Sequence, residues 1–170
     1  MRVWKFGRNI DTDVIVTAKY LNSPDPAEYS KHLMEASDNE DFKRAYGQGK
    51  GSVIGDVFVA DRNFGCGSSR THAPNAIKFA GITYVIAPTF ARIFYRNAFN
   101  IGMPLIECPD AEKIQQGNNI EVLVNEGLIR VPTRDEVYRF SAIPEFMQKL
   151  IESGGVVEFR AREMGYKRRS

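Results

Sequence analysis

One stretch decides the fold class: Val57-Phe58-Val59-Ala60-Asp61-Arg62-Asn63-Phe64-Gly65-Cys66-Gly67-Ser68-Ser69-Arg70-Thr71-His72-Ala73-Pro74. Its first four residues are apolar, which predicts a short buried strand. Pro74 is tolerated only in the first turn of a helix, so residues 65–72 largely precede that helix and cross its N-terminal end. The stretch therefore predicts a strand, a loop in the position of an active site, and a helix.

The same alternation continues toward the C-terminus and indicates an α/β domain. Apolar residues recur at helical spacing over 73–80, which predicts a helix that Gly81 ends. Strands are expected at 84–87 and 104–107. A second helix follows Pro88, and its buried stripe is expected to be Phe90, Ile93, Phe94, Ala98 and Ile101.

The flanking segments are expected to complete one domain over residues 1–170. Residues 23–51 are rich in Pro, Asp, Glu, Gly and Gln, which indicates surface exposure. Within them we expect a short helix at 26–36 and a mobile loop at 37–51. The last third predicts a strand pair, a helix and a closing strand at 120–124, 128–131, 144–153 and 156–159.

Composition narrows the classes of protein. The chain has 23 lysines and arginines against 21 acidic residues, a formal net charge of +2, which indicates no nucleic-acid or membrane partner. The basic end Lys167-Arg168-Arg169 is expected to be a solvated tail. No apolar run approaches the roughly 20 residues of a bilayer span, and the N-terminus lacks the apolar stretch of a signal peptide. The chain is therefore expected to be cytoplasmic.

The cysteines also limit the chemistry. Cys66 and Cys108 are too few for a disulfide framework or for the ligands of an iron-sulfur cluster. We therefore expect no metal site in this chain, and any cluster must belong to another chain.

Residues 65–70 have the composition of an anion site. Gly65 and Gly67 permit a tight backbone path, and a helix N-terminus favours negative charge. Arg70 can hold a carboxylate by a planar two-point contact, Ser69 adds a donor, and Ser68 is free for chemistry. A helix cap by either serine, or a phosphate-binding loop, stays open as an alternative. Walker and esterase-elbow motifs are absent.

Five motifs together resemble the small subunits of 3-isopropylmalate dehydratase and homoaconitase, of the short archaeal and bacterial type: Asn9-Ile10-Asp11-Thr12-Asp13, Asn63-Phe64-Gly65-Cys66-Gly67-Ser68-Ser69-Arg70, His72-Ala73-Pro74, Phe90-Ala91-Arg92-Ile93-Phe94-Tyr95-Arg96-Asn97-Ala98 and Asn100-Ile101-Gly102-Met103-Pro104-Leu105-Ile106-Glu107-Cys108. The resemblance spans nearly the whole chain. It implies the swivelling β/β/α domain of the aconitase superfamily, which closes over a large subunit.

The resemblance also implies which catalytic groups each of the two subunits supplies. The large subunit would carry a [4Fe-4S] cluster that acts as a Lewis acid on the departing hydroxyl group. Ser68 matches the serine base that removes the proton next to a carboxylate, while Ser69 and Arg70 match the residues that bind substrate. Neither subunit alone is then expected to be active, and a homo-oligomer of the isolated chain stays open.

Two positions bear on the substrate. In the family, the residue after Tyr20-Leu21 faces the variable group of the substrate, and here it is Asn22, which also suits a turn before Pro24. Since an amide cannot pair ionically with a third carboxylate, we expect 3-isopropylmalate, with homoaconitate and smaller alkyl-malates (citramalate, dimethylmalate) as alternatives. Thr71 replaces the usual glutamate and can also be a plain helix-start residue.

Other interpretations remain. His72 can be a proton relay or a histidine hydrogen-bonded at the helix start. Cys66 can be redox-sensitive, if the helix end favours its thiolate, or a small packed residue. A protein of another class, which binds anions without catalysis, also stays open.

Overall fold

The computed structural model describes residues 1–47 and 49–165, so the expected tail at 167–169 lies outside the described residues. Its middle layer is a parallel sheet of four strands in the order β1-β2-β3-β4, formed by Val3–Phe6, Val57–Ala60, Tyr84–Ala87 and Leu105–Glu107. All four residues of β2 are buried, because this strand has neighbours on both edges and layers on both faces.

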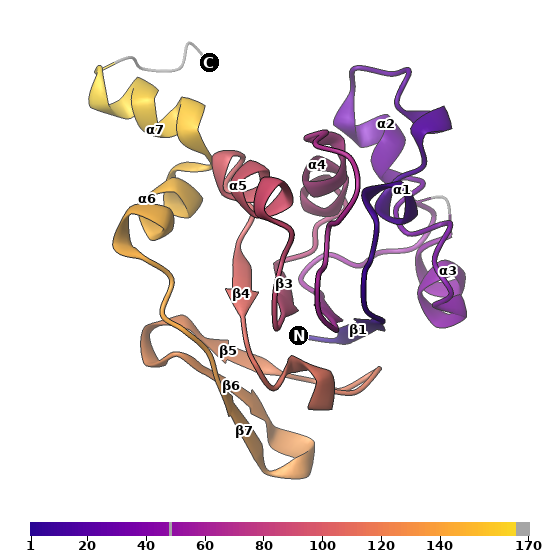
Figure 1. Ribbon diagram of the computed structural model, residues 1–170, viewed down its shortest axis with the longest axis vertical. Coiled ribbons are helices and arrows are strands. Elements are labelled where there is room, and N and C mark those ends of the chain that lie inside the picture. Colours follow the sequence, from indigo (N-terminus) through magenta and orange to yellow (C-terminus); the bar gives the residue numbers. More distant parts are fainter. Residues whose placement is uncertain (48, 166–170) are drawn as a thin grey trace.

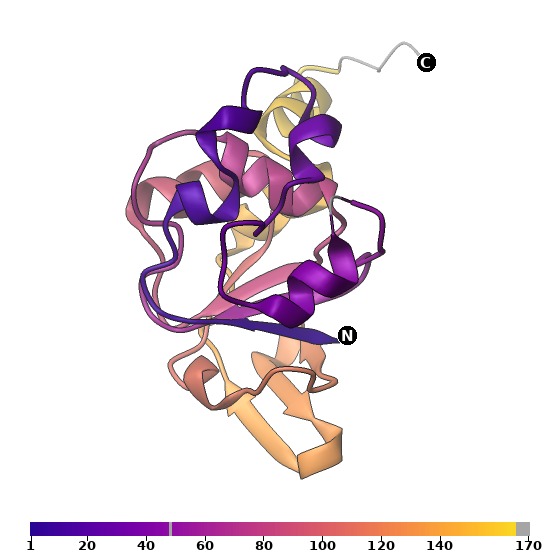
Figure 2. The ribbon, with the colours of Figure 1, turned by 90° about the vertical axis from the view of Figure 1, so that its right-hand side faces the viewer.

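Helices follow the strands and form the layer above the sheet (Figures 1 and 2). Between β1 and β2 lie α1, the short 3-10 helix η1, α2 and α3, at Thr12–Ile15, Ala18–Tyr20, Pro26–Ser30 and Glu40–Tyr46. The crossovers from β2 to β3 and from β3 to β4 contain α4 and α5, at His72–Phe79 and Arg92–Asn100. No helix in the described part of the chain has the length and hydropathy needed to cross a bilayer.

The third layer is a small antiparallel sheet below the parallel one (Figure 2). Its strands β5, β6 and β7 are Glu121–Leu123, Leu128–Val131 and Glu136–Arg139, and short 3-10 helices η2, η3 and η4 lie at Ala111–Lys113, Val124–Glu126 and Pro132–Arg134. The chain then returns upward to α6 and α7, Glu145–Ser153 and Val156–Glu163. The order of layers is the expected β/β/α arrangement.

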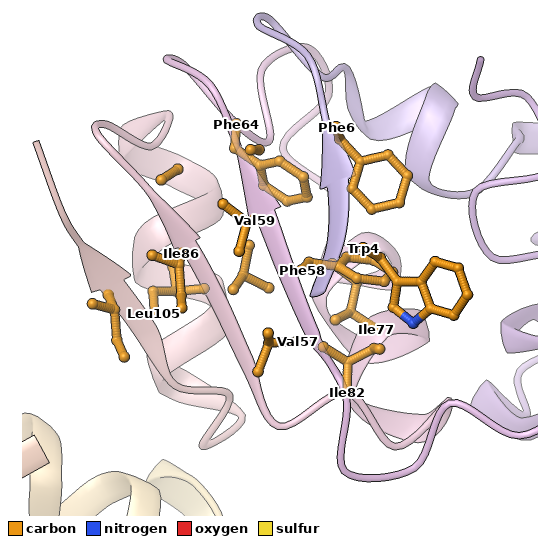
Figure 3. Packing of buried hydrophobic residues seen from close by; sticks show 14 of the residues in the cluster. Trp4, Phe6, Val57, Phe58, Val59, Phe64, Ile77, Ile82, Ile86 and Leu105 are labelled. Atoms are coloured by element: carbon orange, nitrogen blue, oxygen red, sulfur yellow. The ribbon is translucent and has the colours of Figure 1, made fainter. Parts of the chain in front are cut away.

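The core lies between the parallel sheet and the helices, and it corrects one prediction. Phe6 and Phe58 meet with ring centroids 4.8 Å apart, among the buried side chains shown in Figure 3. Phe42 packs edge-on against both rings, and it comes from α3. The prediction of a loop over 37–51 was therefore wrong for residues 40–46. Oδ1 of Asn39 caps this helix by accepting a hydrogen bond from the amide of Phe42 at 2.9 Å. This capping residue was a local signal for a helix, but the polar composition of the segment favoured the prediction of a loop.

Other differences concern the two ends of the chain. The expected strand at 156–159 is the start of α7, since the residues after it, Arg160 to Met164, are strong helix formers. The sequence prediction missed β1 and β7, and the expected helix at 26–36 ends at Ser30. Strands β2, β3 and β6 occupy the predicted residues. On α5, Phe94 and Ala98 are buried as expected, whereas Ile93 is 54% exposed.

Candidate functional site

Three loops meet at the carboxyl edge of the parallel sheet. They follow β1, β2 and β3, and backbone hydrogen bonds join them: Asn9 N donates to Arg62 O at 2.9 Å, Gly65 N to Ile10 O at 2.8 Å, and Phe64 N to Thr89 O at 3.1 Å. In open α/β sheets, ligands bind outside this edge. The loop after β2, residues 61–71, contains the predicted site, and we call it the serine loop.

Two glycines determine the path of the serine loop. Gly65 has a φ of +81°, and a Cβ atom there would lie 2.2 Å from the Phe94 ring. Gly67 has a φ of +95°, and its Cβ atom would lie 2.3 Å from an oxygen of the Asp11 carboxylate. Both positions combine a left-handed backbone with a close neighbour, so any other residue would displace either the loop or that neighbour.

Ser68 is held through its backbone. Its amide donates to Oγ1 of Thr12 at 3.0 Å, and the amide of Thr12 donates to the carbonyl of Cys66 at 2.8 Å. Thr12 is only 4% exposed, so this reciprocal pair is shielded from water. The next residue is fixed from the other side, because Nδ2 of Asn97 on α5 donates to the carbonyl of Ser69 at 2.9 Å. No described residue forms a hydrogen bond with the Ser68 hydroxyl, which is therefore available to a ligand.

The predicted residues lie together at this edge but not in one pocket. Ser68 lines an open groove of about 1440 Å³ between α5 and α6. Arg70 lines a separate, narrow hollow, next to Leu21 and His72. Ser69 and Asn22 are exposed, and Asn22 directly follows Leu21. Ser68 and Arg70 therefore line different hollows, and Asn22 directly follows a residue that lines the hollow of Arg70.

Thr71 rather than a serine occupies the N-cap position of α4. Because the N-cap is Thr71, the interpretation of Ser68 or Ser69 as the helix cap is wrong, and Thr71 is the helix-start residue. Its side chain makes no capping hydrogen bond. The start of α4 therefore keeps its positive dipole end beside the serine loop.

Comparison with known proteins decides the family. The model of the aconitase C-terminal domain matches residues 10–111, which contain the whole serine loop. A 3-isopropylmalate dehydratase small subunit from Sulfurimonas denitrificans is 49% identical over 163 residues, which cover 96% of this chain and 93% of that protein. The chain belongs to the aconitase C-terminal domain family.

Further relatives of this aconitase-family chain agree. A 3-isopropylmalate dehydratase small subunit from Lachnoclostridium phytofermentans is 51% identical over 158 residues, 92% of each chain. The crystal structure of 3-isopropylmalate dehydratase from Methanocaldococcus jannaschii matches with a TM-score of 0.86 at 36% identity, covering 96% of this chain and 93% of that one. The predicted resemblance and fold class are confirmed.

The cysteine of the serine loop has no activated thiol. Burial, and to a lesser degree the carboxylate of Asp11, raise the pKa of Cys66 above its usual value. The alternative of a thiolate favoured by the helix end was therefore wrong, and Cys66 is a partly buried, packed residue. Asp11 is held in place by its own contact, because its Oδ1 accepts from the amide of Asp13 at 2.8 Å.

His72 is the first residue of α4 and packs against Tyr29, with ring centroids 5.3 Å apart. Its Nδ1 is buried and has no hydrogen-bond partner within the described residues. The expected hydrogen bond at the helix start is therefore not made by Nδ1, and a role as a relay stays untested.

The side chains of this family member do not suit an iron-sulfur cluster. Among residues 1–47 and 49–165 no group of three or more His, Cys, Asp or Glu side chains can hold a metal ion. Cys108 is fully buried, and its Sγ donates to the carbonyl of Arg139 at 3.5 Å. A cluster would therefore need ligands from another chain.

The residues that hold the serine loop were not predicted from the sequence. Thr12, Asp11 and Asn97 belong to motifs that resemble the family, yet their sequence positions indicate no role. Each lies far along the chain from the loop it contacts; Thr12 is 56 residues from Ser68 and Asn97 is 28 residues from Ser69. The sequence offered one signal for them: they are polar residues that directly follow a strand or lie on a helix near the carboxyl edge of the sheet.

Proposed function

We propose that this chain is the small subunit of a two-subunit hydro-lyase of leucine biosynthesis, which isomerises 3-isopropylmalate and 2-isopropylmalate through 2-isopropylmaleate in the cytoplasm. Relatives with this name are about 50% identical across nearly the whole chain. The observation that carries the catalytic assignment is the backbone clamp on Ser68, which presents its hydroxyl at the carboxyl edge of the sheet.

In this proposal Ser68 takes the carbon-bound proton next to a substrate carboxylate. A serine hydroxyl is a weak base unless its alkoxide is stabilised, and the positive end of α4 supplies such stabilisation. Ser69 and Arg70 are exposed and can bind substrate carboxylates when a partner covers this edge. A [4Fe-4S] cluster, which we place on the large subunit, would supply Lewis acidity toward the departing hydroxyl group.

The test is reconstitution with a purified large subunit. We expect Ser68→Ala to lower kcat by roughly 100- to 10,000-fold, the usual contribution of a general base, while the affinity for the large subunit is unchanged. Ser141→Ala is the matched control, because Ser141 is an exposed serine beyond β7, outside the groove. Turnover by this chain alone, or full activity of Ser68→Ala, would contradict the proposal, and the latter would favour an anion-binding protein.

The substrate is proposed from the loop that carries Asn22. Leu21 lines the hollow of Arg70 together with the Asp13 carboxylate, and the exposed Asn22 directly follows Leu21. A group bound to Arg70 therefore lies near an apolar side chain and a negative charge. This environment suits the branched side chain of 3-isopropylmalate better than a third carboxylate.

Replacing Asn22 tests that choice. We expect Asn22→Arg to shift the ratio of kcat/KM values toward homoaconitate, since the guanidinium can pair with the additional carboxylate. Asn22→Gln, which keeps the amide, is the control. Steady-state rates with 3-isopropylmalate, homoaconitate, citraconate and dimethylmalate give the measurement. A strong preference of the unmodified pair for a tricarboxylate would contradict the assignment.

A further inference from the structure

The groove that Ser68 lines is too large for the proposed substrate alone. It measures about 1440 Å³, whereas pockets for small molecules usually have about 300–1,000 Å³. One wall comes from α5 and the other from α6, which lie side by side in Figure 1. We call it the α5–α6 groove. Its size suits a polypeptide segment better than a small diacid.

Apolar side chains in the α5–α6 groove are unusually open to solvent. Ile93 on α5 is 54% exposed and Phe146 on α6 is 58% exposed, and both line the groove. Met147 and Leu150 continue the apolar wall along α6. Contiguous exposed apolar surface with a polar rim is typical of protein interfaces.

Two cations lie on the rim of the same groove. Arg92 and Arg96 are exposed and four residues apart on α5, so they lie on one helix face, and neither forms an ion pair with any described residue. Like charges at this spacing destabilise a helix. Glu107 is the one carboxylate among the described lining residues. The rim thus carries excess positive charge, which complements carboxylates on a partner.

The α5–α6 groove is also continuous with the serine loop. Gly65, Gly67 and Ser68 line its end. Asn97 lines it too, and this residue donates to the carbonyl of Ser69 at 2.9 Å. A segment bound in the groove therefore contacts the loop that carries the base and the helix that holds this loop.

We propose that the α5–α6 groove receives a segment of the large subunit that has apolar side chains next to carboxylates. The inference rests on the proposed function, because it takes the large subunit as the partner. The apolar wall supplies the anchor for the segment, and Arg92 with Arg96 orients its acidic side.

The test measures binding of purified large subunit, chosen by its ability to reconstitute isomerase activity with the unmodified chain. We expect Phe146→Asp to weaken this binding by about 10-fold or more, as at interface anchors. The double variant Arg92→Glu/Arg96→Glu should weaken it less at high salt than at low salt. Val157→Asp is the matched control, since Val157 is 73% exposed but lies on α7, outside the groove. Circular dichroism melts verify that each variant folds.

Activity distinguishes this inference from the proposed function. Excess large subunit should restore turnover to Phe146→Asp but not to Ser68→Ala, because the first variant lowers affinity and the second removes the base. If no purified large subunit reconstitutes isomerase activity with the unmodified chain, the proposed function is refuted. An active pair whose affinity is unchanged by Phe146→Asp would overturn the groove assignment alone. The groove assignment would also be overturned if light scattering showed that the isolated chain forms a dimer, and that Phe146→Asp dissociates this dimer without weakening the binding of the large subunit.

Discussion

The serine loop and the two C-terminal helices, α6 and α7, are attached to the molecule in different ways. The serine loop is joined to the loops after β1 and β3 by backbone hydrogen bonds, and at Gly65 and Gly67 there is no space for a side chain. By contrast, α7 has no buried residue, and its Val157 is 73% exposed. The serine loop is thus held by several backbone hydrogen bonds, whereas α7 packs on the molecule without burying any of its residues.

One lysine and one close backbone approach join the C-terminal helices to α4 and α5. Nζ of Lys78, on α4, donates to the carbonyl of Ile101 at the end of α5 and to that of Gly154 at the end of α6, the latter at 3.1 Å. A Cβ atom at Gly155 would lie 2.7 Å from the carbonyl oxygen of Asn100. The Lys78 side chain therefore links the end of α6 to α4 and α5.

Gly65→Ala tests the serine loop and should have the largest effect. The new methyl group would meet the Phe94 ring in a left-handed backbone, so we expect the free energy of unfolding to fall by roughly 2–6 kcal/mol. Gly117→Ala is the control, because Gly117 has a similar φ of +76° with open space around it, and only the backbone strain of roughly 1–2 kcal/mol applies. Urea unfolding gives both values. Equal losses would mean that the contact with Phe94 has no energetic weight.

Lys78→Met tests the attachment of the C-terminal helices. We expect a loss of about 1–2 kcal/mol in local stability, because two helix-end carbonyls lose a charged donor. Hydrogen exchange should speed up in α6 and α7 while the amides of the serine loop keep their protection. Lys149→Met is the control, since Lys149 is solvent-exposed and pairs with Glu145 within α6. Faster exchange throughout the chain would show that the C-terminal helices unfold only with the rest.

Asp11→Asn should have the smallest effect of the three substitutions, and it tests how the Asp11 carboxylate influences the ionisation of Cys66 in the serine loop. The Asp11 carboxylate contributes to the raised pKa of Cys66, so its removal should lower that pKa and increase the thiolate fraction. Asparagine can still cap α1. In a Cys108→Ser background, the rate of alkylation by iodoacetamide near pH 8 should rise, by less than about tenfold, since burial is the larger cause of the shift.

Asp13→Asn is the control for this last experiment, because Asp13 is an exposed carboxylate on the same helix. An equal increase in the alkylation rate from Asp13→Asn would mean that net charge, rather than the contact of Asp11 with the loop, decides the reactivity of Cys66.

The secondary-structure elements predicted correctly from the sequence are those that depend on residues adjacent in the chain. Strands β2, β3 and β6 are short apolar runs, and the predicted residues are those observed. Helix α3 was missed because its place depends on Phe42 reaching the rings of Phe6 and Phe58, which are distant along the chain. Ile93 fits the apolar period of α5, but tertiary packing left it in the open groove.

The sequence by itself determined the strand, the glycine-containing serine loop and the helix after it, because alternation, glycine and proline act through neighbouring residues. It also indicated the family, through motifs that each occupy one continuous stretch. Tertiary structure alone decided that Thr12 and Asn97 clamp the loop, that Ser68 and Arg70 face different hollows, and that Ser68 opens into a groove between α5 and α6. These contacts join residues far apart along the chain, so they exist only once the sheet has aligned its loops at one edge.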